Sequence, residues 1–378
     1  MKKGEGLTYA SVGVSYAAMD PFKRAAQRAA MATNRHAEQS QLTVVDWTRG
    51  ESVLLFYDTV RQCYWGHVHE GLGTKNLVAD AMAQLTGKVY YYGIATDTLA
   101  MGFNDAATLG VRPTSVTMHL SVGSSAWFDD QQRSQALIDG WAVACHKVQC
   151  TWAGGETPTL KGILLPEASE LSCSVWGIIE PVEQLIQGNI EHGDAIVLLG
   201  SSGIHANGLT LAREIALKLS NGYATELETG QPYGEALLEP TVLYGPLIEE
   251  CISKGVDIHY GVNITGHGWR KLMRSPKPFH YVIERVPEPL PIFRFLQEHG
   301  RMSDENMYGD LNMGAGFALY VPPKDVSTVI DLARGRDIPA WEAGYIDGGL
   351  HARQHSDERR VIIEPLQLAW SGETLGVR

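Results

Sequence analysis

The stretch HEGLGTKN near residue 70 holds several groups that could bind a phosphate. Gly71 and Gly73 let the backbone approach a ligand closely, Thr74 carries a hydroxyl, and Lys75 places a positive charge where a helix would begin. Glu70 offers a hard oxygen ligand suited to magnesium. The stretch matches neither G-x-x-x-x-G-K-[ST] nor G-x-G-x-x-G. On these residues alone, a strand-to-helix turn capped by Thr74 remains the alternative.

A second group of polar side chains lies in TDTLAMGFND. Asp97 is seven and eight residues from Asn104 and Asp105, about two helical turns, so the three side chains would lie near one face of a helix. That helix is otherwise built from Leu, Ala, Met and Phe, where a buried acid needs a cation or strong hydrogen bonds. Capping or solvation of these acids is the alternative.

Two further loops combine glycines with polar side chains. AGGETPT follows a short strand and contains Gly154, Gly155, Glu156 and Thr157, for which a simple turn is the alternative. LLGSSGIHANGLTLARE joins a strand to a helix, and the polar side chains between them are Ser201, Ser202, His205 and Asn207. Such a loop suits an anion or a polar substrate. His205 taken alone could be structural, but the four loops together favour an enzyme that uses a nucleotide and magnesium.

Hydrophobic periodicity predicts the elements that carry these loops. In the first half we expect strands at 52–60, 63–71, 112–122 and 170–180, and helices at 74–87, 91–110 and 129–149. In the second half we expect strands at 194–200, 256–264, 314–321 and 359–365, and helices at 209–219, 241–255, 291–300 and 324–335. Residues 35–50, 151–159 and 157–170 read as loops, and residues after Pro365 as a tail.

This order predicts an α+β protein of two domains. The boundary lies near Pro181, which gives a domain of residues 1–180 and a second of residues 181–378. The strands at 52–57 and 64–68 are apolar on both faces, which favours burial of the N-terminal sheet on both sides.

Composition narrows the class of protein further. The formal net charge of -12 disfavours a nucleic-acid partner, and no apolar run is long enough to predict a membrane span. The N-terminal stretch lacks the apolar core of a secretory signal. The five cysteines show no C-x-x-C spacing, so we expect a reduced, cytoplasmic protein without a disulfide framework or zinc site. Cys145 adjoins His146, but neighbouring helical side chains point apart, which disfavours a nucleophilic pair.

Seven motifs in a fixed order resemble those of the aminoimidazole ribonucleotide synthetase family, the phosphoribosylformylglycinamidine cyclo-ligases. They are EGLGTK, FND, GGET, GSSGIHANG, PTVLY, TGHG from Thr265 and NMGAG. The similarity runs from about residue 8 to 364. The superfamily also contains selenophosphate synthetase, thiamine monophosphate kinase and a hydrogenase-maturation protein, all of which use ATP.

The resemblance implies a two-domain homodimer that pairs through its N-terminal domains and binds ATP with magnesium near that interface. ATP would activate the amide oxygen of formylglycinamidine ribonucleotide, and an internal amine would then close the imidazole ring and release phosphate. It also implies three sets of ligand-binding residues. ATP would contact Glu70, Gly71, Gly73, Thr74, Lys75, Asn104, Gly154, Gly155, Glu156 and Thr157. Magnesium would bind Asp97, Asp105 and Glu156, and the second substrate would contact Ser201, Ser202, His205, Asn207 and Thr265. Lys75, Asp105 and His205 would be catalytic.

Several positions depart from the family pattern. Glu70 stands where the family has Asp, His267 replaces a glycine of T-G-G-G, and Pro158 begins an altered segment after GGET. Gly309 replaces an arginine, which removes a bidentate anchor for an anion. A paralogue that acts on another small substrate and a non-catalytic dimeric partner therefore remain alternatives to the cyclo-ligase.

Overall fold

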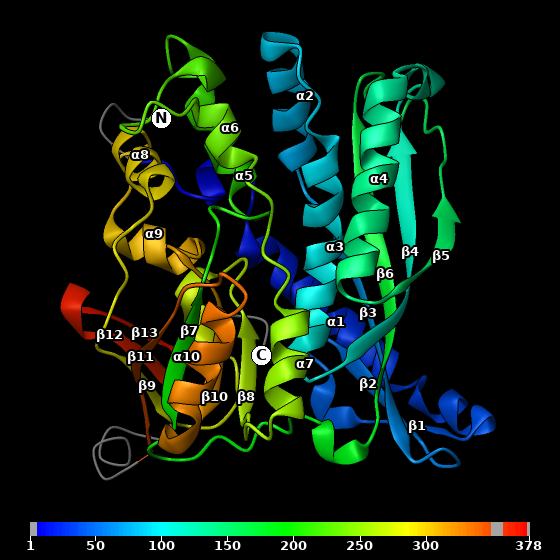
Figure 1. Ribbon diagram of the computed structural model, residues 1–378, viewed down its shortest axis with the longest axis vertical. Helices are drawn as coiled ribbons and strands as arrows, with labels where there is room; N and C mark the ends of the chain where they lie inside the picture. The colour runs from blue at the N-terminus through cyan, green and yellow to red at the C-terminus, as the bar shows by residue number, and fades with distance from the viewer. Residues whose placement is uncertain (1–5, 349–357, 376–378) are drawn as a thin grey trace.

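The protein consists of two α/β units that lie side by side, each built on one sheet (Figure 1). The computed structural model describes residues 6–348 and 358–375. The first sheet ends at Ile179 and the second begins at Ala195, so the chain passes between the units within a short segment. Mixed helices and sheets in two units confirm the predicted α+β class.

The first unit is a six-stranded sheet with four helices. Its strands in spatial order are β1 (Leu42–Val44), β2 (Leu54–Asp58), β3 (Cys63–Gly71), β6 (Ser169–Ile179), β4 (Arg112–Val122) and β5 (Thr151–Glu156). Its helices are α1 (Tyr16–Met31), α2 (Lys75–Thr86), α3 (Tyr91–Ala107) and α4 (Gln131–Lys147). All neighbouring strands are antiparallel except β4 and β5.

Helix α3 covers one face of this sheet at very close range. A Cβ on Gly102 would lie 2.7 Å from the Val175 side chain and 3.0 Å from Cys173 Sγ. Glycine therefore sets how closely the helix can approach β6. This packing fixes the acids of α3 relative to the loop that follows β3.

The second unit is a seven-stranded sheet. Its strands in spatial order are β13 (Leu368–Ser371), β12 (Arg360–Ile363), β9 (His280–Ile283), β11 (Ala340–Asp347), β7 (Ala195–Gly200), β10 (Ala315–Val321) and β8 (Tyr260–Asn263). Its helices are α5 (Leu209–Ala216), α6 (Tyr233–Leu237), α7 (Gly245–Ser253), α8 (Pro291–Gly300), α9 (Asp304–Asp310) and α10 (Val326–Arg334). Strands β7 and β10 are buried along their whole length, as their continuous apolar sequences predict.

Most predicted elements are confirmed within a few residues. Residues 112–122 and 291–300 form β4 and α8 with the predicted bounds, and Gly87 ends α2 in a left-handed conformation with φ 71°. Helix α7 begins at Gly245, four residues later than predicted. Helices α1 and α9 and strands β1, β9 and β11 were not predicted.

Three predictions of secondary structure were wrong. Residues 35–50 were predicted as a loop but contain most of a 3-10 helix at Asn34–Ser40 and the strand β1, which pairs with β2. Residues 151–156 form the edge strand β5 instead of a loop, because they pair in parallel with β4. The glycine-rich sequence does not predict this pairing. Residues after Pro365 form β13 and a turn of 3-10 helix at Gly372–Leu375 instead of a tail. Trp370 and Leu375 are buried there, and this burial offsets the cost of ordering the segment.

Candidate functional site

A cavity of about 250 Å³ between the two units brings together three of the predicted site residues. Glu70 at the end of β3 and Asp105 on α3 come from the first unit, and Thr265 follows β8 in the second. The sequence had assigned the two acids to ATP and magnesium and Thr265 to the second substrate. The cavity therefore lies where those two predicted ligands would meet.

The two acids of this cavity lie close enough for the charge of one to act on the other. Burial, followed by the charge of Asp105, raises the pKa of Glu70 to about 7. Asp105 Oδ1 accepts a hydrogen bond from Asn263 Nδ2 at 2.7 Å, which orients its carboxylate. A carboxyl group with a pKa near 7 gains from a nearby cation, so this pair favours the binding of a positively charged ligand or metal ion.

Cationic side chains complete the lining of the cavity. Lys271 and Arg274 lie three residues apart on or just after a turn of 3-10 helix at Gly268–Met273, and Lys23 reaches the cavity from α1. Lys271 Nζ donates to Thr265 Oγ1 and, at 3.3 Å, to the Asn263 carbonyl. Burial, followed by the charge of Arg274, lowers the pKa of Lys271 to about 8. Acidic and cationic side chains thus line one small cavity, which suits a ligand that carries both positive and negative charge.

A second, smaller crevice joins the two loops that the sequence had linked to phosphate and substrate. Gly73 and Thr74 line one side, and Asn207 with the start of α5 lines the other. Asn207 Oδ1 accepts from the Gly266 N–H at 3.1 Å, and Gly266 also lines the first cavity. The crevice and the cavity therefore adjoin at Gly266.

Lys75 and Asp97 form a fully buried ion pair. Lys75 Nζ lies 2.8 Å from Asp97 Oδ1 and donates to the Glu239 carbonyl at 2.7 Å. The same Asp97 oxygen accepts from the Thr241 N–H at 2.8 Å and from Thr241 Oγ1 at 2.6 Å. These contacts tie α2 and α3 to the second unit, while the phosphate contact expected of Lys75 and the metal contact expected of Asp97 remain predictions.

Burial acts on both members of this pair in opposite directions. It lowers the pKa of Lys75 and raises the pKa of Asp97, while the charge of each partner works against these shifts. The three hydrogen bonds to Asp97 Oδ1 favour the ionised carboxylate. Asp97 Oδ2 is buried without a hydrogen-bond partner, so the site tolerates one unsatisfied oxygen.

Other predicted residues serve to hold loops together. Asn104 accepts from the Tyr244 N–H at 2.9 Å and donates to the Val242 carbonyl at 2.8 Å, so it fixes the segment before α7. Ser201 Oγ donates to Asn312 Oδ1 at 2.9 Å. Ser202 Oγ donates to the Pro240 carbonyl at 2.6 Å.

His205 is buried, and its ring accepts a hydrogen bond from within its own loop. Nε2 accepts from the Ser202 N–H at 3.3 Å, and φ at His205 is 60°, in the left-handed region. Burial, followed by the charge of Lys75, lowers the pKa of His205 to about 3, which keeps the imidazole neutral. This arrangement favours the alternative in which His205 bonds the loop to itself.

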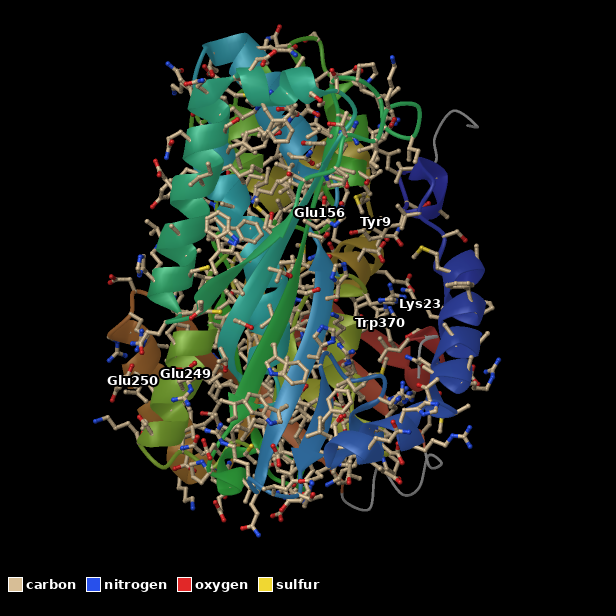
Figure 2. The ribbon with its side chains drawn as sticks, turned by 90° about the vertical axis from the view of Figure 1, so that its right-hand side faces the viewer. Tyr9, Lys23, Glu156, Glu249, Glu250 and Trp370 are labelled. Carbon is tan, nitrogen blue, oxygen red and sulfur yellow. The ribbon has the colours of Figure 1, made fainter. Side chains whose placement is uncertain are left out.

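The GGET segment lies apart from the cavity, along the exposed edge strand β5. Gly154, Gly155, Glu156 and Thr157 are all exposed, and Glu156 pairs with His119 of β4. A Cβ on Gly155 would lie 2.0 Å from the Met118 carbonyl oxygen, so glycine is required there for the strands to pair. Glu156 lies near the end of the sheet that faces the viewer in Figure 2.

Glu70 and Asp105 fit magnesium better than the predicted set of Asp97, Asp105 and Glu156. Within residues 6–348 and 358–375, no three His, Cys, Asp or Glu side chains cluster closely enough to hold a metal ion. Magnesium commonly binds one or two carboxylates together with substrate phosphates, and Glu70 and Asp105 supply hard oxygens beside a shared cavity.

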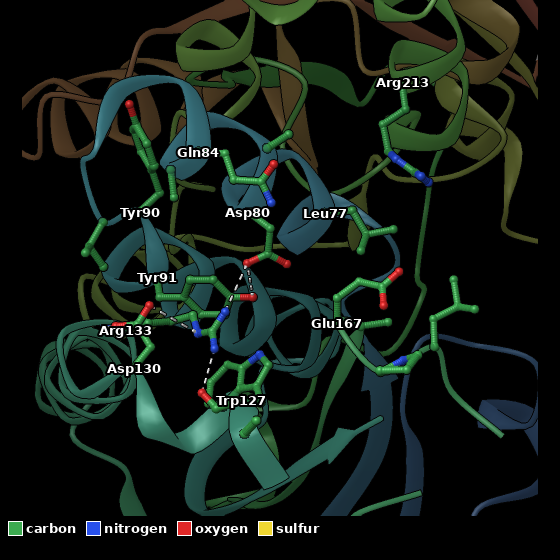
Figure 3. A pocket seen from close by; sticks show the side chains of 17 residues that line it. Leu77, Asp80, Gln84, Tyr90, Tyr91, Trp127, Asp130, Arg133, Glu167 and Arg213 are labelled. Atoms are coloured by element: carbon green, nitrogen blue, oxygen red, sulfur yellow. Dashed lines mark hydrogen bonds and ion pairs between the residues drawn. The ribbon is translucent and has the colours of Figure 1, made fainter. Parts of the chain in front are cut away.

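A larger cavity, of about 750 Å³, contains none of the predicted site residues (Figure 3). Arg133 lies 4.3 Å above the Trp127 ring and donates to the Trp127 carbonyl at 2.6 Å. Tyr91 donates to Asp80 Oδ1 at 2.9 Å, and burial raises the pKa of Asp80. These side chains mainly contact one another, so they form an ionic cluster and do not point their polar groups at a common ligand position.

Sequence reasoning missed most of the cationic lining of the first cavity. Lys23, Lys271 and Arg274 belong to none of the predicted ligand sets. A signal for two of them was present, since Lys271 and Arg274 follow TGHG at a spacing of three residues that suits one helical face. Cys145 is buried, and burial raises the pKa of its thiol to about 11, which agrees with an inert thiol. No helix in the described ranges could cross a membrane.

Several solved structures share this fold. The chain superposes on the HypE-HypF complex with a TM-score of 0.56 at 14% identity, over 85% of this chain and 92% of that chain. It superposes on AaThiL complexed with AMPPCP and TMP with a TM-score of 0.55 at 13% identity, over 85% and 91% of the chains. A crystal structure of tt0281 from Thermus thermophilus gives 0.53 at 16% identity, over 84% and 90%.

The chain belongs to the AIR synthase related protein family. Residues 70–179 match the N-terminal domain of that family, and residues 191–354 match its C-terminal domain. The chain is 32% identical over 297 residues to a phosphoribosylformylglycinamidine cyclo-ligase of Methanocaldococcus jannaschii, covering 78% of this chain and 81% of the relative. It is 33% identical over 276 residues to the cyclo-ligase of Methanothermobacter thermautotrophicus, covering 72% and 78%. The resemblance drawn from the seven motifs is thereby confirmed.

Proposed function

We propose that the protein is an ATP-dependent cyclo-ligase of purine synthesis, which converts formylglycinamidine ribonucleotide to aminoimidazole ribonucleotide with release of ADP and phosphate. The observation that supports this most is the cavity in which Glu70 and Asp105 of the first unit face Thr265 and Lys271 of the second. Relatives named as cyclo-ligases cover most of the chain at about 31–33% identity. The cytoplasm remains the expected compartment.

The chain's own residues would position the reactants rather than react covalently. The N–H groups at the start of α2 and of α5, beside Gly73 and Asn207, would hold phosphate oxygens of ATP. Lys271 and Arg274 would offset negative charge at the transferring phosphoryl group. The amide oxygen of the substrate would attack the γ-phosphorus as ADP leaves, and the internal nitrogen would then displace phosphate from carbon as the ring closes.

Magnesium, if bound, would be held by Glu70 and Asp105 and would neutralise charge on the phosphate oxygens. The structure favours this pair because Glu70 has a pKa near 7 that a bound cation would lower. Asn263 would keep the Asp105 carboxylate directed by its hydrogen bond of 2.7 Å. The longer side chain of Glu70, where the family resemblance expects Asp, would move its oxygen atoms further into the cavity.

Turnover in the wild type and in Asp105→Asn tests this proposal. The wild type should consume ATP only when formylglycinamidine ribonucleotide is present. Asp105→Asn should lower kcat by roughly a thousandfold, since one lost metal-binding charge removes several kcal/mol of transition-state stabilisation. Near-normal turnover by a folded Asp105→Asn at saturating magnesium would contradict the role of this carboxylate.

We further propose a homodimer that pairs through the open face of the first sheet. Figure 2 looks onto this face, and among residues 6–348 and 358–375 no helix covers it. Val175 and Cys173 face α3, so strand alternation and register place Trp176, Trp65 and Phe56 on the opposite face. The rings of Trp65 and Trp176 stack with centroids 5.7 Å apart, and the Phe56 ring lies 6.1 Å from Trp176. All three rings are only half-buried in the single chain. An aromatic patch of this kind on an uncovered sheet face supports an interface.

Sedimentation of the full chain tests the homodimer. We expect a dimer at micromolar concentration for the wild type and a monomer for Trp176→Lys. Phe22→Lys is the matched control, because Phe22 is an exposed aromatic on α1, outside the sheet. A monomeric wild type, or dimers of all three proteins, would contradict the proposed interface.

A further inference from the structure

The C-terminal segment, residues 368–375, forms part of the wall of the charged cavity. Strand β13 pairs antiparallel with β12, and the following turn buries Leu375, which lines the cavity with Glu70 and Lys271. The segment lies beyond residue 354, where the match to the family's C-terminal domain ends. Part of the wall is therefore contributed by residues that lie outside the matched family domains.

Several contacts hold this segment in place. The Gly372 N–H donates to the Arg359 carbonyl at 3.0 Å, and Arg270 Nη1 donates to the Thr374 carbonyl at 3.4 Å. Trp370 is 6% exposed. In Figure 2 the segment that carries Trp370 lies beside Lys23 of α1.

The same segment lies beside Gly309, where the family pattern has an arginine. A Cβ on Gly309 would lie 3.6 Å from Arg270 Nε and 3.7 Å from the Trp370 ring. Arg270 Nε donates to the Gly309 carbonyl, and Nη2 donates to Asp310 Oδ1, both at 2.8 Å. A guanidinium thus lies beside Gly309, but its donors hold the chain rather than face the cavity. Gly309 and residues 368–375 therefore meet around the Arg270 side chain.

We propose that Leu375 is a specificity-determining residue for the second substrate of this enzyme, a small phosphorylated molecule whose reacting end enters the cavity. This inference rests on the proposed function. Lys23 would attract the anionic part of that molecule, while Leu375 and Met101 are the apolar side chains of the lining. The volume of about 250 Å³ equals that of roughly eight water molecules, so a side chain in the wall has a large effect on what fits.

We assign Leu375 to the second substrate rather than to ATP because of the unit from which this part of the cavity wall comes. Leu375 belongs to the second unit together with Thr265, Lys271 and Arg274, whereas Glu70 and Asp105 belong to the first. The crevice that would hold the ATP phosphates lies beyond Gly266 and does not include Leu375. Changes at Leu375 should therefore separate the two ligands in a kinetic assay.

Substitutions in the full-length chain test the proposal. Leu375→Asp should raise KM for formylglycinamidine ribonucleotide at least tenfold and leave KM for ATP within twofold. Leu375→Ala should give a smaller rise of the same kind, and the conservative Leu375→Met should stay near wild type. Leu368→Ala is the matched control, since Leu368 is half-buried on the same segment and does not line the cavity. An unchanged KM in folded Leu375→Asp and Leu375→Ala, or an equal rise in the control, would overturn the proposal.

Binding of inorganic phosphate, measured by calorimetry, separates this inference from the proposed function. If the wild type does not turn over formylglycinamidine ribonucleotide, the proposed function fails. In that case at least tenfold weaker phosphate binding by Leu375→Asp, with Leu375→Met and Leu368→Ala unchanged, would still support Leu375 as part of the ligand-binding wall. Equal phosphate affinity in all four proteins would overturn it.

Discussion

The buried pair of Lys75 and Asp97 gives the sharpest test of how the two units are joined. Asp97→Asn leaves the Lys75 ammonium, which is wholly buried, without a countercharge. Removal of one partner from a buried ion pair costs about 3–5 kcal/mol. At about 2–4 °C per kcal/mol for a domain of this size, the unfolding midpoint should fall by roughly 6–20 °C.

Thermal unfolding followed by circular dichroism measures this loss, and a double variant checks its cause. Lys75→Met with Asp97→Leu removes both charges, so it should be more stable than Asp97→Asn. The double variant should not regain the full stability of the wild type. The N–H and Oγ1 of Thr241, which donate to Asp97 at 2.8 and 2.6 Å, would lose their acceptor. Lys23→Met, which removes an exposed cation, should change stability by no more than about 0.5 kcal/mol.

A particular result would refute this reasoning. If Asp97→Asn unfolded at the wild-type temperature but lost magnesium-dependent turnover, Asp97 would act as a metal ligand and not as an internal partner of Lys75. The first interpretation of the sequence would then be correct for this residue.

Three further predictions concern single side chains. His205→Ala should lower the unfolding midpoint while kcat, measured below that midpoint, stays within about threefold of wild type; a large loss of kcat in a stable variant would restore the catalytic interpretation. Burial lowers the pKa of His259, but the carboxylates of Asp194, 2.7 Å away, and of Asp257 raise it, and the net shift is upward. The protonated ring therefore stabilises the folded protein fully below the unfolded pKa of about 6.5, and this stabilisation disappears as pH rises through the folded pKa. His259→Gln should therefore destabilise the protein more at pH 5.5 than at pH 9 in urea titrations, and an equal loss at both would contradict this. Gly155→Ala should cost about 1–3 kcal/mol and speed hydrogen exchange along β5, and unchanged exchange there would show that the strand can adjust.

The sequence predicted the elements with strong periodicity and clear ends. Strand β4 and helix α8 have the predicted bounds, since their ends carry turn residues or Pro at the first helical position. Strand β5 was missed because its glycines weaken the strand pattern, and it is stabilised by pairing with β4 and by packing of Trp152 against Trp141 of α4. Residues 368–375 were missed because part of what holds them, such as the hydrogen bond from Arg270 to Thr374, comes from residues about a hundred positions earlier in the chain.

The roles predicted for the site residues remain predictions. The structure places Glu70, Asp105 and Thr265, which come from three different motif loops, at one cavity. Helical spacing placed Asp97 near Asp105 but could not show that Lys75 of α2 forms an ion pair with Asp97 of α3. An ion pair between residues far apart in sequence depends on packing, which periodicity does not describe. The position of Leu375 in the cavity wall likewise depends on how the C-terminal segment packs against the rest of the protein, which no local sequence pattern predicts.

The fate of one oxygen atom tests the central proposal most directly. Formylglycinamidine ribonucleotide labelled with oxygen-18 at its amide oxygen would be incubated with ATP and the full-length protein, and the products analysed by mass spectrometry. The account predicts equal amounts of aminoimidazole ribonucleotide, ADP and inorganic phosphate, with the label in the phosphate. ATP consumption without aminoimidazole ribonucleotide, or phosphate that lacks the label, would contradict it.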